Sequence, residues 1–535
     1  MGLGNRYSQH SFAQVPEVRQ ARSFFDRSYG RKTTFNFDYL TPCFLQMVVA
    51  GDTMNLNVNS FFRLATQKVP IMDNMKIKFY FFYCPKRLLW DNFVKMYGEQ
   101  EDPGDSTDYI YPQMTGPNTG AGGFAVGSLA DYFGIPTGVG SILLKNCLAF
   151  RMYYKTYNEW FRDQNLENSL VWSRGDGPDL PGDFTLQLVN RSQDYFMGGL
   201  PWPQKGPAVD IPLGTTAPVL GIAARNQNWT TGPSATVYET TGATTFASYK
   251  TIDPAAVNDQ FLVEKSLTSG NPDIRVDLSN ATAATINQLR EAFAVQSIFE
   301  LDARNGTRFT EVIQGHFGVF NGDARLQRVE FLSSGSITIN SHPVAQTAPT
   351  SGSNPQAQLA AFSTASSSGT HIGFTKSFTE PGYVMGLMVA TADMTYQQGI
   401  PKEFMRSTRF DDFWPKLQDL GEQAVMLGEL YAQGTSADYE TVLNYQERFA
   451  DLRYSPSEIT GEFRSTYAQS LDMWHMAPEF SSAPSFNSTF LKTRTPIERA
   501  LAVTDGPDLI GDLWFSLKHA RPMVARPVPS TIGRF

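Results

Sequence analysis

The sequence predicts an all-β protein: a single eight-stranded antiparallel jelly roll with large inter-strand insertions that contain some helices. Three observations lead to this fold class. Several short segments alternate between apolar and polar residues, long loops rich in proline, glycine and polar residues separate them, and no internal repeat occurs. Short strands joined by elaborate loops are typical of sandwiches and jelly rolls, whose helices lie within the loops.

The clearest predicted strands lie near the start of the chain. In residues 54–59 methionine, leucine and valine alternate with three asparagines, and Gly51 and Asp52 supply a turn before them. Residues 75–81 alternate in the same way. This second strand is expected to stop at Pro85, because proline has no N–H to donate to a sheet.

The middle of the chain predicts helices and a further strand. Residues 144–163 place apolar side chains near one helical face, and residues 286–303 show a similar spacing. Between them, residues 184–188 alternate and are expected to form a strand. A turn-rich loop is expected at 102–123.

The last two hundred residues predict strands, a loop and a helix. Residues 325–340 alternate as a strand, and residues 383–393 are apolar enough to be a strand buried on both faces. Residues 349–370 are expected to be a loop. Residues 417–431 have helical spacing, although two glycines within it weaken that prediction.

The composition changes after Leu200. A rigid Pro-Trp-Pro hinge is expected at Pro201, Trp202, Pro203 and Pro207, and the residues that follow are rich in Thr, Ala, Gly and Asn. Such a long polar segment is uncommon in a compact domain, and surface loops often serve recognition. The expected parts are an extended basic arm at 1–32, a jelly-roll core at 33–206 and 286–535, and a polar insertion forming a surface protrusion at 207–285.

Hydropathy and cysteine content point to a reducing compartment. The mean hydropathy is −0.28, no apolar run approaches the roughly 20 residues that span a bilayer, and residues 1–20 lack the apolar core of a secretory signal. Cys43, Cys84 and Cys147 are odd in number and far apart, which favours buried free thiols. The chain is therefore expected to be made in the cytoplasm.

Both ends of the chain are basic although the net charge is −8. Solvated tails would explain this pattern, and so would two ends that face a polyanion. If the second interpretation holds, ten side chains are candidates to face nucleic acid. They are Arg6, Arg19, Arg22, Arg27, Arg31, Lys32, Lys518, Arg521, Arg526 and Arg534.

The sequence offers no convincing active site. None of the six histidines has metal-ligand spacing, and neither a nucleophile elbow nor a P-loop lysine motif occurs. The fragment at 120–125 fits a loose dinucleotide fingerprint, but it follows a turn-rich loop and not a strand. No catalytic residue, metal or cofactor is predicted, and the protein is not expected to be an enzyme.

Many short segments, in one order along nearly the whole chain, resemble the major capsid protein of the microviruses, small icosahedral single-stranded DNA bacteriophages, and within them the gokushovirus type. Each segment is weak alone, and their joint presence is specific. They are SFFDRS (23–28), KTTF (32–35), GDT (51–53), MDN (72–74), WDN (90–92), YNEWFRDQN (157–165), DYF (194–196), LPWPQKGPAV (200–209), RLQR (325–328), HPVAQT (342–347), YQQG (396–399), LGEQAV (420–425), FRSTYA (463–468) and ARPM (520–523).

The resemblance implies a structural protein of the virion. Sixty copies, by way of homo-pentamers, would form a T=1 shell around circular single-stranded DNA, in a bacterial cytoplasm. The implied partners are the packaged genome, a small basic internal DNA-binding protein, a minor or pilot capsid protein and a receptor on the host surface. The insertion would project near the three-fold axes and serve host attachment, with candidate residues Trp229, Tyr238, Thr240, Thr241, Thr244 and Thr245.

Two other classes of protein remain open from the residues alone. A jelly-roll carbohydrate-binding protein, similar to a lectin, would use exposed aromatics such as Trp229 and Tyr238. An enzyme on a β scaffold, such as a glycosidase, would need two carboxylates flanking a sugar bond. The 39 phenylalanines favour burial shared between a core and subunit interfaces.

Overall fold

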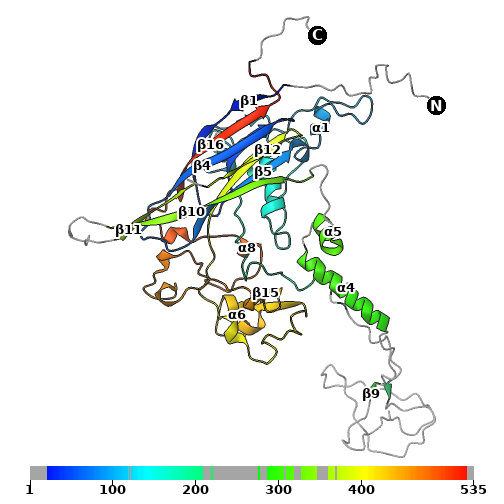
Figure 1. Ribbon diagram of the computed structural model, residues 1–535, viewed down its shortest axis with the longest axis vertical. Helices are drawn as coiled ribbons and strands as arrows, with labels where there is room; N and C mark the ends of the chain where they lie inside the picture. The colour runs from blue at the N-terminus through cyan, green and yellow to red at the C-terminus, as the bar shows by residue number, and fades with distance from the viewer. Residues whose placement is uncertain are drawn as a thin grey trace, which may run out of the picture. The chain divides into compact units, whose positions relative to one another are not determined.

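Two four-stranded antiparallel sheets form the centre of the protein (Figure 1). The computed structural model describes residues 21–118, 120, 122–207, 209, 219–220, 275–276, 286–305, 309–318, 327–345, 359–367 and 370–526. The first sheet runs β2 (Tyr29–Phe35), β16 (Leu509–Arg521), β4 (Thr53–Leu64) and β12 (Gly373–Ser377). The second runs β3 (Thr41–Val48), β13 (Gly382–Ala392), β5 (Met75–Pro85) and β10 (Glu330–Ala345).

This strand order confirms the predicted jelly roll. Each sheet interleaves strands from the early and the late parts of the chain, as two Greek keys require. Two further strands complete the ten-stranded system. β1 (Ser23–Asp26) extends the line of β2 along β16, and β11 (Leu359–Ser366) pairs with both β10 and β4, so that it joins the two sheets.

Phenylalanine fills the core between the sheets. Phe62 on β4 meets Phe35 on β2 edge to face, with ring centroids 5.7 Å apart. Phe44 on β3 contacts Phe515 on β16 and Phe81 on β5, at 5.2 and 6.4 Å. Aromatic pairs in this range add to the free energy of burial, and here they connect strands from both sheets.

A second core covers the other side of β5 and β13. β13 is apolar on both faces, as predicted for residues 383–393, and β5 is so from Tyr80 onward, because α3 (Leu148–Thr156) and the π-helical turn η3 (Tyr157–Phe161) pack outside them. The helix predicted at 144–163 is confirmed for residues 148–161, whereas Leu143 and Leu144 form a short strand. The three cysteines are buried free thiols, as predicted, and burial raises the pKa of each, to about 12 for Cys43 and Cys147.

Within this second core lies a buried ion pair. Arg151 is fully buried, and its Nε and Nη2 atoms each donate to Asp179 at 2.7 Å. Its Nη1 donates to the carbonyls of Leu89 and Gly175, at 3.2 and 2.8 Å. The guanidinium therefore ties together loops that would otherwise bury unpaired carbonyls.

The remaining elements are short and lie in the loops. They are η1 (Lys86–Leu88), α1 (Phe93–Met96), β6 (Met114–Thr115), α2 (Leu129–Tyr132), β7 (Leu143–Leu144), η4 (Pro181–Asp183), α5 (Phe309–Phe317), η6 (Lys402–Met405), β14 (Glu422–Met426), α6 (Leu427–Leu430), α7 (Ala437–Glu440), β15 (Val442–Glu447), η7 (Ala450–Leu452), η8 (Gly461–Phe463), η9 (Asp472–Trp474), α8 (Ser488–Leu491) and η10 (Ile497–Arg499). Among the helices described, none is both long and apolar enough to cross a bilayer.

A second compact unit comprises Gln204–Gly306, and it is described by itself. It contains helix α4 (Ile286–Arg304), as predicted for 286–303, and the paired two-residue strands β8 (Val219–Leu220) and β9 (Arg275–Val276). The unit includes the expected insertion at 207–285. The candidate recognition residues Trp229, Tyr238, Thr240, Thr241, Thr244 and Thr245 lie outside the described residues.

The strand expected at 184–188 is wrong. Its backbone donors go to side chains, because Tyr154 accepts from the Thr185 N–H at 3.0 Å and Tyr153 accepts from the Gln187 N–H at 3.0 Å. Only an isolated bridge forms, between Tyr39 and Leu188. Buried tyrosine hydroxyls thus replace a neighbouring strand.

The helix expected at 417–431 is also wrong. Gly421 has φ +98° and breaks it, and the residues that follow form β14 and the single turn α6. The loop expected at 349–370 contains β11, whose inward residues include Ala361, Ser363 and Ala365 and so give no apolar signal. The arm expected at 1–32 is built into the sheet from Ser23 onward, as β1 and β2.

Replacing Asp179 by alanine is expected to destabilise the purified chain by about 3–5 kcal/mol, because Arg151 would remain charged and buried without its partner. The measurement is the free energy of unfolding in urea. The matched control is Asp91→Ala, which breaks the exposed pair with Arg174 and should cost at most about 1 kcal/mol. An equal decrease in the free energy of unfolding for the two variants would contradict this account.

Candidate nucleic-acid interface

The two basic ends of the chain meet in one sheet. β1 and β2 both pair with β16, so that Asp26 lies opposite Lys518 and Lys32 lies opposite Asp512. On its other edge β16 pairs with β4 over twelve positions, from Leu509 to Ala520. β1, β16 and β4 lie side by side in Figure 1. The segments predicted to share a polyanionic partner are therefore neighbours.

Alternation along the strands gives this sheet a buried and an open side. On β16, Leu513, Phe515 and Leu517 are fully buried, while the residues between them face outward. On β4 the inward residues are Met54, Leu56 and Val58, as the sequence predicted. We call the open side the β16 face. Its exposed residues include Lys32, Asn55, Asn59, Phe61, Arg63, Ile510, Asp512, Trp514 and Lys518.

Four of the ten predicted nucleic-acid contacts are exposed at or next to this face. Lys32 and Lys518 lie on it, and Arg22 lies beside β1, where its guanidinium donates to the Thr53 hydroxyl and to the Ala520 carbonyl. Arg526 is exposed beyond the end of β16. Three others, Arg6, Arg19 and Arg534, lie outside the described residues.

The other three predicted contacts make internal hydrogen bonds or are partly buried. Arg31 points inward and donates to the carbonyls of Cys43 and Tyr132, at 2.9 and 2.5 Å. Arg521 donates to Asp52 at 3.2 Å and to the Met47 carbonyl at 2.7 Å. Burial and the charge of Arg521 lower the pKa of Arg27. Arg31 and Arg521 therefore connect the first sheet to neighbouring segments.

The Asp52 carboxylate organises the end of this sheet. It is fully buried, accepts from the Val49 N–H at 2.8 Å and lies 3.1 Å from both Arg521 and His519. Burial and the charge of Arg521 lower the pKa of His519 to about 4, although Asp52 opposes this. His519 is therefore neutral at pH 7, and one arginine balances the buried carboxylate.

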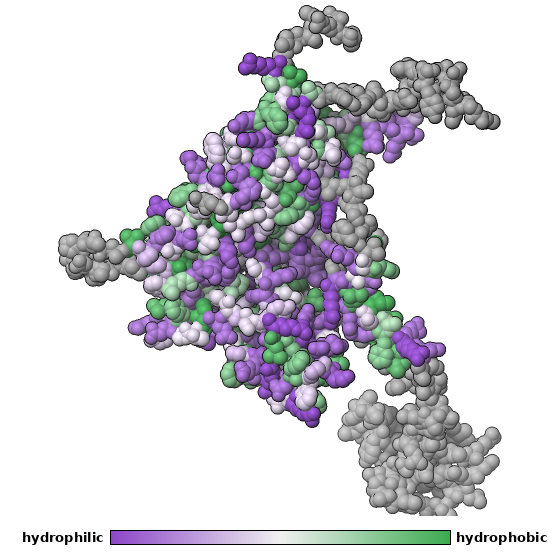
Figure 2. Space-filling model, viewed as in Figure 1, coloured by the Kyte–Doolittle hydropathy of each residue, from purple (hydrophilic) through white to green (hydrophobic). Residues whose placement is uncertain are grey.

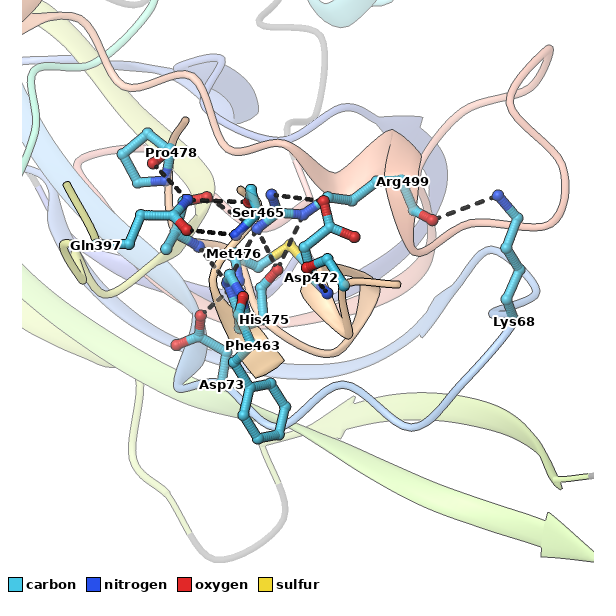
Figure 3. Close-up of polar contacts among 12 residues, drawn as sticks. Lys68, Asp73, Gln397, Phe463, Ser465, Asp472, His475, Met476, Pro478 and Arg499 are labelled. Carbon is cyan, nitrogen blue, oxygen red and sulfur yellow. Dashed lines mark hydrogen bonds and ion pairs between the residues drawn. The ribbon is translucent and has the colours of Figure 1, made fainter. Parts of the chain in front are cut away.

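A second polar cluster surrounds His475 and consists mainly of loop residues (Figure 3). The ring Nε2 lies 2.8 Å from the Phe463 carbonyl, and Nδ1 lies 3.1 Å from both the Ala477 N–H and Arg499 Nη2. Because two donors point at Nδ1, the proton must sit on Nε2. Arg499 also donates to the carbonyls of His475 and Ala477, at 2.5 and 2.8 Å.

Further hydrogen bonds connect this cluster to other parts of the chain. Asp73, in the loop before β5, accepts from the Met476 N–H at 2.8 Å, and Lys68 donates to the Arg499 carbonyl at 3.3 Å. The Gln397 amide donates to Ser465 and to the Pro478 carbonyl, at 3.0 and 3.1 Å. The cluster thus holds several loops against the jelly roll.

A nearby cavity of about 460 Å³ is lined by four carboxylate residues, which are Glu403, Glu429, Asp451 and Glu458. Glu429 accepts from Lys402 at 2.6 Å and from Tyr195 at 2.7 Å. Asp451 is paired with Arg406. Glu429 and Asp451 are therefore each held in an ion pair. Within the described residues, no group of three or more His, Cys, Asp or Glu side chains is placed to hold a metal ion.

Comparison with known proteins places the chain in a family. A family model described as "Capsid protein (F protein)" matches residues 13–531. The chain belongs to this family of phage capsid proteins. Capsid protein VP1 of Bdellovibrio phage phiMH2K is 50% identical over 100% of both chains. VP1 of Chlamydia phage 1 is 37% identical over 97% of each chain, and VP1 of Spiroplasma virus 4 is 35% identical over 98% of this chain and 97% of its own.

These findings confirm the predicted resemblance to microvirus capsid proteins. They assign the capsid protein a structural role in the virion, where its copies assemble into a shell. The lectin-like alternative and the enzyme alternative lose their basis, because the match covers nearly the whole chain and is to capsid proteins throughout.

Sequence reasoning missed three exposed functional candidates on the β16 face. Trp514 was not identified as a candidate because the strand at 509–521 was not recognised. Asn59 and Arg63 lie on β4, and they become candidates only when β16 is placed beside that strand. A signal exists: Leu513, Phe515 and Leu517 alternate with Trp514 and Ser516, which places the indole on the open side.

Acidification is expected to loosen the His475 cluster. Burial, together with the charge of Arg499, lowers the pKa of His475, whereas Asp472 and Asp73 raise it. A second proton on the ring would have to sit on Nδ1, where two hydrogen-bond donors already point. The folded chain therefore binds that proton less tightly than the unfolded chain does. The stability contribution is fully present above pH about 6.5 and falls as the pH drops below that value.

The measurement is the melting temperature of the capsid protein between pH 7.5 and pH 5. His475→Gln should lower the melting temperature at pH 7.5. On acidification to pH 5, the melting temperature of this variant should fall by less than that of the wild type. The control is His371→Gln, at an exposed histidine, which should leave the pH dependence unchanged. A wild-type pH slope in the His475 variant would contradict the assignment.

Proposed function

We propose that sixty copies of this capsid protein assemble, by way of pentamers, into a T=1 icosahedral shell around circular single-stranded DNA. Full-length similarity to three phage capsid proteins is the observation that supports this most strongly. The jelly roll suits the role, because its loops can supply interface area on several sides. Assembly would take place in the cytoplasm of the bacterial host.

Exposed apolar side chains support burial between copies. Among the described residues, Phe24, Val171, Phe404 and Ile110 each expose more than two thirds of their surface. Figure 2 shows hydrophobic residues interspersed with hydrophilic ones over the visible side. A mixed surface of this kind is compatible with subunit contacts, because an interface taken as a whole is about as apolar as the rest of a protein surface. Much of the stability of the protein would then appear only in the shell.

The internal partner proposed for the β16 face is the packaged genome. The observation behind this proposal is that β1, β2 and β16 bring Arg22, Lys32 and Lys518 together in one sheet. Contacts to phosphates would hold the DNA without reading its sequence. A small basic internal protein would supply further neutralisation, which fits a net charge of −8 on this chain. A minor or pilot protein would complete the particle.

The insertion at 207–285 is proposed to project near the three-fold axes and to attach the particle to a receptor on the host, as in the gokushovirus type. Support for this comes from its position after the Pro-Trp-Pro hinge and from its polar composition. Helix α4, which follows it, leaves Phe293 and Ile298 largely exposed, as expected of a segment that packs against other copies.

Shell formation is tested by size. The purified capsid protein, expressed with its phage partners, should form particles of megadalton mass in sedimentation and discrete shells in electron micrographs. Pentamers should precede them, because closed symmetry is built from repeated copies of the same interface. A chain that stays monomeric at high concentration under these conditions would exclude the proposed assembly.

Deletion tests the insertion separately. Removing residues 214–282 should leave the jelly roll folded, because its strands and both cores lie outside this segment. We expect adsorption to host cells, or the yield of stable particles, to drop at least tenfold. The control is the same deletion followed by a melting experiment on the purified chain. Normal infectivity together with normal particle yield would refute the recognition role.

A further inference from the structure

We infer that the β16 face binds unpaired DNA bases by stacking, with Trp514 and Phe61 as the platform. This inference rests on the proposed function, since it names the surface through which the shell would contact its genome. Trp514 exposes 51% of its surface and Phe61 exposes 53%, although both lie in the middle of long paired strands. Single exposed rings are common on protein surfaces, whereas neighbouring ones on one sheet face form the kind of apolar patch that marks an interaction site.

The indole of Trp514 lies next to Gly30 on the neighbouring strand β2. Gly30 on β2 lies opposite Trp514 in the strand register, and a Cβ atom placed there would be 3.4 Å from Cε3 of the indole. The ring therefore leans across Gly30 and leaves its other side open. Phe61 on β4 is a diagonal neighbour, because Asn59, two residues earlier, pairs with Trp514. Diagonal pairs are about 7–8 Å apart, so adjacent bases could contact both rings.

Polar groups around the two rings lack partners. Within the described chain, the Asn59 amide, the Arg63 guanidinium and the indole N–H of Trp514 make no hydrogen bond, whereas the neighbouring Asn55 donates to Thr375 at 2.7 Å. An asparagine amide both donates and accepts, as the edges of bases do. A free guanidinium suits a phosphate. The β16 face thus offers a ring, an amide and a cation side by side.

Charge on the β16 face favours an anion. Lys32 lies 3.3 Å from Asp512, and both are exposed, so this ion pair contributes little and can be exchanged. Hydrogen bonds from Ser28 lower the pKa of Asp26, and the charge of Lys518 adds to this effect. Each acid on the face therefore has a lysine nearby. Arg63 and Arg22 remain as excess cations, on a chain that is acidic as a whole.

A cavity of about 600 Å³ opens beside this platform. It is lined by Phe61, Arg63, Lys32 and Tyr132, and also by the carboxylates of Asp131 and Asp512. Those carboxylates would repel a phosphate and accept hydrogen bonds from the amino groups of a base. The cavity therefore suits a base turned out of the strand, with its phosphate over Arg63.

These features favour single-stranded nucleic acid over a protein partner. Ile510 is the aliphatic residue among the nine named for the face, whose other members are charged, amide-bearing or aromatic. Base stacking on aromatic rings needs no aliphatic surround and works for any sequence. A duplex keeps its bases stacked on each other and could use only the cations. The inference thus predicts a preference for single strands that depends on the rings.

The test uses the purified full-length chain before assembly and two probes, a 20-nucleotide oligothymidine and a 20-base-pair duplex. Trp514→Ala should weaken oligothymidine binding about 5- to 150-fold, the effect of losing one stacked base, and leave duplex binding unchanged. Trp514→Phe should restore most of the affinity. Phe61→Ala is a second variant at the same platform and should act in the same direction.

Two controls separate stacking from charge and from general damage. Lys32→Gln with Lys518→Gln should weaken both probes and lower the salt slope for the single strand by about 1.4, the value for two phosphate contacts. Trp414→Ala removes an exposed indole from a distant loop and should change neither probe. Melting temperatures verify that each variant is folded.

Several outcomes would overturn the inference. They are wild-type oligothymidine binding in both Trp514→Ala and Phe61→Ala, or equal losses for single strand and duplex. If particle yield falls while oligothymidine binding stays normal, the face docks another protein instead. The proposed shell is tested separately from base stacking, because its test is the mass of the wild-type particles.

Discussion

The insertion of β16 between strands from the start of the chain is the constraint on which the rest of the structure depends. One edge of β16 pairs with β1 and β2 and the other with β4, so that contacts such as that between Arg22 and Ala520 join residues 498 positions apart. Without β16 the first sheet would lose its centre, and the phenylalanine core would lose one wall. The polar anchors at Asp52 and Arg521 fix the same strand at its end.

Long-range pairing of this kind also determines what the surface can do. The two ends of the chain each bring cations, and only the register of β16 with β1 and β2 makes them neighbours. The same register places Trp514 over Gly30 and beside Asn59. The surface combines two strands near the start of the chain, β2 and β4, with one near its end, β16, so no single stretch of sequence contains it as a motif.

The fold class was predictable because a strand with one polar face shows alternating apolar and polar residues in the sequence. Residues 54–58 and 75–81 were located correctly, as were the helices at 144–163 and 286–303. Prediction failed where the buried residues are small or polar. β11 buries alanine and serine, and β2 turns Tyr29, Arg31 and Thr33 inward. The false strand at 184–188 failed for another reason, because tyrosine hydroxyls from α3 satisfy its backbone.

The candidate site was predictable in part. The basic ends were identified by charge alone, but charge could not separate Lys32 and Lys518, which are exposed, from Arg31 and Arg521, which hold the sheet together. That distinction depends on which side of a strand each residue faces. The polar cluster at His475 has no sequence signal, since its hydrogen bonds go mainly to backbone groups from loops far apart in the chain.

The position of β16 has a consequence for biosynthesis. A ribosome releases the early strands long before residues 509–521, so the first sheet stays open with its phenylalanines accessible until the last strand arrives. A chain interrupted before that point cannot complete the first sheet or form the β16 face. Closure by a late strand therefore acts as a length check, which admits to the shell only chains translated through Arg521.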